Sequence, residues 1–376
     1  MKFAPLLAAA VSLAPMASAK QYLAFVGTYT GEKSKGIYAY RLDTTSGIIE
    51  ELGLAAETSN PTFLALHPKG PYLYAANEIA DFKGTKSGAI TAYRIDPANG
   101  HLTALGSAST VGSGPCHVNV DATGRQVVYA NYGSGSVGSL PLGNDGNVGP
   151  SGTFFQHTGS SVNLQRQKEP HGHSMNFSPD GRYAFACDLG TDEIRAYHFN
   201  PATGLTAAPD LLTKAVSGGG PRHLTFGPDG HFAYVNNEML NSVTAFAYDV
   251  TAGRLKPLQT LSTLPEGFFG NSSTAEVRTS PNGQWLFVSN RGHDSLARFR
   301  ITPGQGTLTA AGHVPTGGKV PRNFCPTPDG QFLWAANQET DNIVVFRMNQ
   351  DSGELVRTGQ ELKVGKPVCV RFLEVK

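Results

Sequence analysis

A motif repeated six times constrains the fold of this chain more than any other feature. Each copy has Pro or a small residue, a short apolar segment, a Pro-Asp-Gly-like turn, a second apolar segment and then Asn or Asp, as in SPDGRYAFACD and GPDGHFAYVNN. The turn glycines are Gly70, Gly124, Gly181, Gly230, Gly283 and Gly330, about fifty residues apart. Repeats of this length, with four short strands each, are typical of β-propeller blades.

Each copy continues into a third apolar segment that alternates with polar residues, such as GAITAYRID and NSVTAFAYD, and this period of two indicates strands. The ends of the chain supply one more blade. Residues 22–43 read as a second and third strand without a first, and residues 366–375 read as a first strand alone. We therefore predict an all-β, seven-bladed propeller, one domain over residues 20–376, closed by pairing of the N- and C-terminal strands in one blade.

The first 19 residues resemble a secretory signal peptide. Lys2 precedes an apolar stretch from Leu6 to Met16, and Ala17-Ser18-Ala19 fits the small-residue cleavage rule. The apolar stretch is too short to span roughly 30 Å of hydrocarbon, so an uncleaved anchor is disfavoured. We expect an exported protein, periplasmic or secreted, with no membrane segment in its mature form.

Charge and cysteine content narrow the partners. Thirty basic and twenty-nine acidic residues give a net charge of +1, which disfavours nucleic acid as a partner. The four cysteines, Cys116, Cys187, Cys325 and Cys369, lack close pairing and a Cys-x-x-Cys motif. We expect them to be small buried residues in strands, although two disulfides stay possible in an exported chain.

Two positions in the repeat separate scaffold from site. Seven residues after each turn glycine the residue is Asn, or Asp188 in the third copy, and such a constant polar side chain predicts a bond to the backbone of the next turn. The residue after it varies, as do those seven and eight positions before the glycine. In a blade, the start of the first strand and the end of the second lie on one face, so these variable residues are expected at one mouth of the axis.

The variable positions supply the candidate site residues. They are His117, His173, Arg222, His223, Glu238, Glu276, Arg291 and Arg322, and the third copy, which is longer by two residues before its turn, adds His171. A competing interpretation is that they are solvated charges in a wet channel or mutually neutralising pairs, such as Arg222 with Glu238.

Several catalytic motifs are absent or out of context. The segment GSGSVG joins two predicted strands and does not open a helix, so it is a turn rather than a dinucleotide loop. The sequence contains no Gly-x-Ser-x-Gly elbow and no His-Glu-x-x-His motif. The candidate residues instead suit hydrolysis of a cyclic ester by activated water. A histidine such as His173, oriented by Glu238, is a candidate base, and Arg222 and Arg291 are candidate donors to an oxyanion or to an anionic substituent.

Three segments resemble the seven-bladed propeller lactonases of the 6-phosphogluconolactonase type, whose relatives include fungal carboxymuconate cyclases. They are PHGHSMNFSPDGRYAFACD with His171 and His173, GPRHLTFGPDGHFAYVNNE with Arg222 and Glu238, and SPNGQWLFVSNRGHDSL with Arg291. The resemblance implies lactone hydrolysis without a cofactor or metal. It also implies His173 or His171, Glu238, Arg222 and Arg291 as catalytic residues. We add His117, His223, Glu276 and Arg322 as substrate-binding candidates.

The sequence leaves several functions open. The family substrate that bears a phosphate is made in the cytoplasm, so an unphosphorylated sugar lactone is a second candidate substrate for an exported chain. The pattern is also compatible with a non-catalytic binding or assembly propeller, with a muconate-cyclase-like enzyme, and with a metal-assisted lactonase using His171, His173 and His223. The oligomeric state is not indicated by the sequence.

Overall fold

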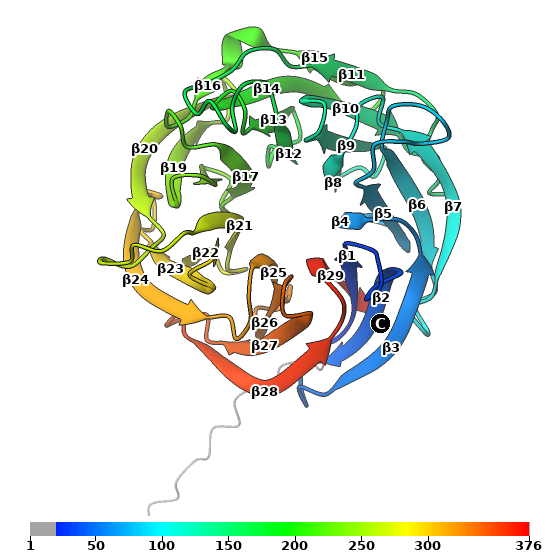
Figure 1. Cartoon of the computed structure of the whole chain (residues 1–376), viewed down its shortest axis with the longest axis vertical. Helices are drawn as coiled ribbons and strands as arrows, with labels where there is room; N and C mark the ends of the chain where they lie inside the picture. The colour runs from blue at the N-terminus through cyan, green and yellow to red at the C-terminus, as the bar shows by residue number, and fades with distance from the viewer. Residues whose placement is uncertain (1–19, 376) are drawn as a thin grey trace, which may run out of the picture.

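The computed structural model describes residues 20–375 as a closed ring of seven twisted sheets around an axis (Figure 1). Six sheets have four antiparallel strands, and the sheet of the third repeat has a short fifth strand. The predicted all-β, seven-bladed propeller is therefore confirmed. The predicted signal peptide, residues 1–19, lies outside the described residues, within which no helix is long and apolar enough to cross a membrane.

The innermost strands surround the axis and contact one another in sequence around the ring. They are β4 (Pro61–Leu66), β8 (Pro115–Val120), β12 (Gly172–Phe177), β17 (Pro221–Phe226), β21 (Ser273–Thr279), β25 (Pro321–Pro326) and β29 (Pro367–Val375). The second strands run antiparallel to them and end near the face of the propeller where the first strands begin. They are β1 (Gln21–Thr28), β5 (Tyr72–Asn77), β9 (Gln126–Asn131), β13 (Tyr183–Asp188), β18 (Phe232–Asn237), β22 (Trp285–Arg291) and β26 (Phe332–Asn337).

The two outer strands of each sheet complete the blades. The third strands are β2 (Gly36–Asp43), β6 (Ala89–Ile95), β10 (Ser136–Pro141), β14 (Glu193–Asn200), β19 (Ser242–Asp249), β23 (Ser295–Ile301) and β27 (Asn342–Met348). The fourth strands are β3 (Ile49–Glu57), β7 (Leu102–Ser109), β11 (Thr153–Gln156), β15 (Gly204–Ala207), β20 (Arg254–Ser262), β24 (Leu308–Pro315) and β28 (Leu355–Lys363). In the third repeat a 3₁₀ turn, η1 (Pro209–Leu211), interrupts the edge before β16 (Thr213–Lys214) pairs with β14.

The chain ends close the ring as predicted. Strand β29 pairs with β1 from Gln21↔Val375 to Thr28↔Pro367, so the C-terminal strand is the innermost of a sheet whose other three strands are N-terminal. The Tyr40 ring of this blade packs edge-on against Trp334 of the preceding blade, and Tyr22 lies in the same buried cluster. Burying each such aromatic side chain contributes about 1.5–3 kcal/mol, and this packing between neighbouring sheets stabilises the closed propeller.

The repeated glycines and asparagines have distinct roles. Five of the six turn glycines have positive φ, such as 68° at Gly181 and 69° at Gly330, a conformation that favours glycine. The repeated Asn side chains are buried. Asn131 and Asn290 donate to the carbonyls of Thr110 and Thr263, which lie in the connection entering the blade. In these blades the side chain bonds the backbone of the preceding connection and the hydroxyl of the serine that begins the third strand, Ser136 or Ser295, rather than the backbone of the following turn.

The third blade carries Asp188 at this position and departs from the pattern. One carboxylate oxygen accepts from the backbone amides of Gly190 and Thr191, as predicted for this position, and the other lies 2.5 Å from Nδ1 of His157. His157 in turn contacts the hydroxyl of Tyr197 at 2.8 Å. Unlike asparagine, a carboxylate has no N–H group and can only accept hydrogen bonds. In this blade the buried His157 side chain donates to the carboxylate.

The cysteines are all free thiols. Cys116, Cys187 and Cys369 are buried in β8, β13 and β29, and Cys325 is half-buried in β25. The prediction of small buried strand residues is confirmed for the first three.

Candidate active site

A bulge at the start of the inner strands sets the geometry of the axis. In the six repeat copies the register shifts there, for example between Pro115 and His117 and between Pro221 and Leu224. A bulge places two residues opposite one, so two consecutive side chains can turn the same way. Arg222 and His223 show the result, because Arg222 contacts Glu238 at the mouth and His223 contacts Glu276 deeper along the axis.

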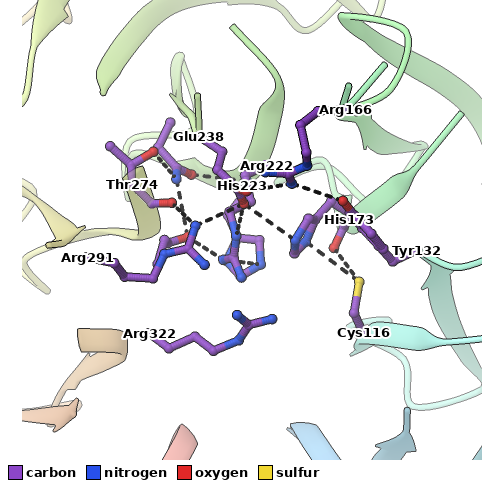
Figure 2. Close-up of polar contacts among 12 residues, drawn as sticks. Cys116, Tyr132, Arg166, His173, Arg222, His223, Glu238, Thr274, Arg291 and Arg322 are labelled. Atoms are coloured by element: carbon purple, nitrogen blue, oxygen red, sulfur yellow. Dashed lines mark hydrogen bonds and ion pairs between the residues drawn. The ribbon is translucent and has the colours of Figure 1, made fainter. Parts of the chain in front are cut away.

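The mouth holds a cavity of about 320 Å³ with charged walls. Its lining residues come from the starts of first strands, the residues that end or follow second strands, and one loop: Glu78, Cys116, Tyr132, Arg166, His173, Glu238, Ser273, Arg291 and Arg322. Figure 2 shows seven of these side chains converging from several blades: Cys116, Tyr132, Arg166, His173, Glu238, Arg291 and Arg322. The polar residues that vary between repeats therefore meet at one end of the axis.

Glu238 is the centre of an ionic cluster. Its Oε2 lies 3.0 Å from Nε of Arg222 and 3.1 Å from Nη2 of Arg291, and its Oε1 lies 3.0 Å from Nη2 of Arg166 (Figure 2). Burial alone raises the pKa of a carboxyl group, but the charges of Arg291, Arg222 and Arg166 prevail and lower the pKa of Glu238 to about 2. The carboxylate is ionised and neutralised at neutral pH.

His173 lies beside this cluster as an uncharged ring. Its Nε2 is 3.9 Å from Oε2 of Glu238, and its Nδ1 is 3.6 Å from the sulfur of Cys116. Burial, followed by the charge of Arg222, lowers the pKa of His173 well below its ordinary value. A neutral imidazole has one donor and one acceptor nitrogen. Because Nδ1 faces the Cys116 sulfur, Nε2 is the nitrogen placed to contact a ligand in the pocket.

Glu78 has different surroundings from Glu238. Both of its carboxylate oxygens lie 3.0 Å from the Tyr29 hydroxyl, and Oε2 also accepts from Thr62 Oγ1 at 2.6 Å. Arg322 donates to the same Tyr29 hydroxyl at 3.1 Å. The Tyr29 hydroxyl can therefore accept a hydrogen bond from Arg322 while it donates one to Glu78. This hydrogen-bond arrangement orients the side chains of Glu78 and Arg322.

A second layer lies deeper along the axis. Nδ1 of His223 is 3.0 Å from Oε1 of Glu276, and Nη1 of Arg222 donates to His223 Nε2 at 3.1 Å. This assigns the imidazole proton to Nδ1. Burial lowers the pKa of His223 to about 4, so it is uncharged. The ring of His117 packs 4.2 Å from that of Phe63.

The structure sorts the residues proposed from the sequence. His173, Glu238, Arg291 and Arg322 line the mouth, and Arg222 pairs with Glu238 there. His117, His223 and Glu276, expected to bind substrate, are buried in the second layer and do not line the mouth cavity. His171 does not line the cavity: its ring stacks on Tyr132 with ring centroids 4.5 Å apart, and its Nδ1 lies 3.0 Å from the Tyr132 carbonyl.

Three pocket residues, Glu78, Cys116 and Tyr132, occupy variable positions of the repeat but were not among the predicted site residues. Arg166 gave no signal, because it lies in the connection between β11 and β12, outside the repeat. It reaches the mouth from there and donates to the Tyr132 hydroxyl at 3.0 Å.

The interpretation of mutually neutralising pairs is partly right, since Arg222 and Glu238 do pair. Yet the mouth gathers four arginines, Arg166, Arg222, Arg291 and Arg322, around two carboxylates. Within residues 20–375, no group of three or more His, Cys, Asp or Glu side chains is placed to hold a metal ion.

The fold and the pocket define a β-propeller with a cationic small-molecule site at one end of its axis. The chain belongs to the lactonase family of seven-bladed β-propellers, whose family model matches residues 23–372.

Similar proteins agree with this assignment. The chain is 37% identical over 309 residues to the 6-phosphogluconolactonase of Bacillus subtilis, covering 81% of this chain and 84% of that protein. It is 34% identical to the 6-phosphogluconolactonase of Formosa agariphila, covering 80% and 85%. The periplasmic gluconolactonase of Pseudomonas aeruginosa has a similar structure, with a TM-score of 0.88, 37% identity, and coverage of 95% of this chain and 100% of that one.

Proposed function

We propose that this protein is a carboxylic ester hydrolase that opens a sugar lactone, such as gluconolactone or its 6-phosphate, by adding water at the axial mouth. Membership of the lactonase family and relatives named for these two activities support the choice of substrate. The observation that carries the proposal is the convergence of His173, Arg222, Glu238 and Arg291 at one pocket, from segments far apart in the sequence.

The chemistry follows from the charges. When water adds to the lactone carbonyl, negative charge develops on the carbonyl oxygen, and fixed donors stabilise it. Arg291 and Arg222 are held by Glu238 and are already desolvated, so they need little reorganisation to bind an oxyanion. Neutral His173 hydrogen-bonds the lactone ring or a hydroxyl group beside it.

The excess of arginines also bears on substituents. Arg322 forms no ion pair with a carboxylate of residues 20–375, and its side chain donates instead to the Tyr29 hydroxyl. Guanidinium groups suit phosphate and carboxylate through paired donors. The pocket therefore suits a lactone that carries an anionic substituent, while neutral sugar lactones remain substrates of the same chemistry.

We further propose that the protein is exported, with residues 1–19 as its signal peptide. The basic start, short apolar stretch and Ala-Ser-Ala site support this, and the similar Pseudomonas protein is described as periplasmic. An exported enzyme meets unphosphorylated sugar lactones more readily than a cytoplasmic sugar phosphate.

The test is hydrolysis of gluconolactone and of its 6-phosphate at pH 7, with the spontaneous rate subtracted. We expect His173→Ala and Arg222→Ala to lower kcat/KM by about 10²–10³, the usual cost of losing one such donor. Arg254→Ala is the matched control, because Arg254 is exposed on β20. Wild-type rates in both pocket variants would remove the proposed site.

A further inference from the structure

We propose that Glu78 is a further catalytic residue of this site, the carboxylate that takes the proton from the attacking water. The inference rests on the proposed lactone hydrolysis and names a role that His173 and Glu238 fill poorly. It stands on the position of Glu78, its hydrogen bonds and the lack of a cationic group within ion-pair distance among residues 20–375.

The two carboxylates of the mouth differ in their neighbours. Glu238 contacts three guanidinium groups, and taking up a proton would break a buried ionic cluster. Within residues 20–375, no Lys, Arg or His nitrogen lies within 4.0 Å of the Glu78 carboxylate, whose hydrogen bonds come from the hydroxyls of Tyr29 and Thr62. Glu78 can accept a proton without leaving an arginine unpaired.

Its position in the ring fits the role. Glu78 follows β5 in the first repeat, and Arg222 and Glu238 belong to the blade of β17 and β18, across the axis from β4 and β5 (Figure 1). A lactone carbonyl held by Arg222 and Arg291 would therefore present its carbon toward the Glu78 side of the pocket.

A small cavity lies between Glu78 and Arg222. It has a volume of about 10 Å³ and is bounded by Thr62, Phe63, Glu78, Cys116, Arg222, His223, Arg322 and Val368. This volume is near the minimum for one water molecule, and the polar walls suit one. A water there has Glu78 as the acceptor for its proton.

The reaction balances without a co-reactant. The water oxygen forms a bond to the carbonyl carbon while Glu78 takes one water proton, and the carbonyl oxygen becomes an oxyanion facing the arginines. Collapse of this intermediate breaks the ring C–O bond, and the leaving ring oxygen takes the proton back from Glu78. The resulting hydroxy acid then releases its carboxyl proton to solvent.

The experiment measures steady-state kinetics of Glu78→Gln between pH 4 and 9. We expect kcat to fall by about 10²–10⁴ with KM within about threefold, since general base catalysis typically contributes this factor. The acid limb of the kcat/KM profile should disappear. Glu339→Gln is the matched control, because Glu339 is an exposed glutamate beside Gln338, which occupies the corresponding position of another blade.

Two further measurements separate catalysis from folding. Formate should restore part of the rate of Glu78→Ala by replacing the missing carboxylate, which a merely structural role would not allow. Tyr29→Phe keeps the carboxylate but removes a hydroxyl that orients it, and should lower kcat about tenfold, the effect of about one hydrogen bond.

The outcomes distinguish the two proposals. Wild-type protein without turnover of any lactone would overturn the proposed function. Normal wild-type turnover, with Glu78→Gln within threefold of wild type and an unchanged acid limb, would overturn the role of Glu78 and leave the lactonase standing. If the Glu78 variants do not fold, a wild-type rate in Tyr29→Phe overturns it.

Discussion

Nε of Arg222 lies 3.0 Å from Oε2 of Glu238, and both side chains are almost fully buried. The two residues belong to one blade, Arg222 in β17 and Glu238 directly after β18, while the other two arginines that contact Glu238 come from the next blade and from the connection before β12. One carboxylate thus links three separate parts of the ring at the mouth.

Replacing this carboxylate should destabilise the fold. We expect Glu238→Gln to lower the free energy of unfolding by about 3–5 kcal/mol at pH 7, because it leaves buried guanidinium groups without their counter-charge. Urea denaturation of the variant and the wild type measures the difference. Glu339→Gln, which removes an exposed charge, should change it by less than about 0.5 kcal/mol.

The difference in the free energy of unfolding between the wild type and Glu238→Gln should decrease at acidic pH. The pKa of Glu238 is lowered from 4.5 to about 2 in the folded protein. A lowered carboxyl pKa contributes stability that is fully present above pH 4.5 and is lost as the pH falls toward 2. The gap between wild type and Glu238→Gln should narrow over that range, and a gap that widens there would contradict the ionic cluster.

Arg166 should act on binding more than on chemistry. Its side chain is 44% exposed and reaches Glu238 from a loop, unlike buried Arg222. We expect Arg166→Ala to raise KM for an anionic lactone about tenfold with kcat within about threefold, which is the signature of lost uniform binding. A neutral lactone serves as the control substrate and should show little change in KM.

Metal removal should leave activity intact. The mouth gathers arginines, which repel a divalent cation. The two histidines that the sequence places close together both pack on Tyr132 but use their Nδ1 atoms differently: that of His171 contacts the Tyr132 carbonyl, whereas that of His173 faces the Cys116 sulfur. We expect full lactonase activity after exhaustive dialysis against a chelator, checked by elemental analysis. Activity lost on chelation and restored by one metal would favour a metal-assisted lactonase.

The architecture was predictable because the same turn and strand-end residues recur in six copies of the repeat. A glycine, with positive φ in five of the six copies, ends each inner hairpin, and a buried Asn or Asp ties the second strand to a neighbouring connection. These features recur at nearly constant spacing, so the strand order and the ring closure follow from counting. The chain ends fit the count only as parts of one blade, and β29 does pair with β1.

The site was predictable only to the level of positions. Repeat alignment located the mouth, yet it did not separate the two layers, because a bulge turns neighbours such as Arg222 and His223 toward different depths. It also gave no access to Arg166, which lies outside the repeat. Glu78 occupies one of the variable positions, but its proposed role depends on having no arginine within ion-pair distance among residues 20–375. That arrangement is a property of the assembled ring and not of the repeat.

The buried pair of His157 and Asp188 offers a test of how one blade compensates for its departure from the repeat. Nδ1 of His157 lies 2.5 Å from Oδ2 of Asp188, whose other oxygen accepts three backbone amides, those of His171, Gly190 and Thr191. Removing the ring alone leaves a buried carboxylate without one of its donors.

We therefore expect His157→Ala to lower the free energy of unfolding by about 3–5 kcal/mol. Asp188→Asn should cost less, about 1–2 kcal/mol. The Asn keeps an oxygen for the three amides, and its NH₂ group can donate to His157 once the imidazole proton moves to Nε2, facing the Tyr197 hydroxyl. In the double variant the Asn restores the residue found in the other repeat copies, so the two losses should be less than additive by at least about 1 kcal/mol in urea denaturation. Strict additivity would mean that the histidine acts by filling space and not by satisfying the aspartate.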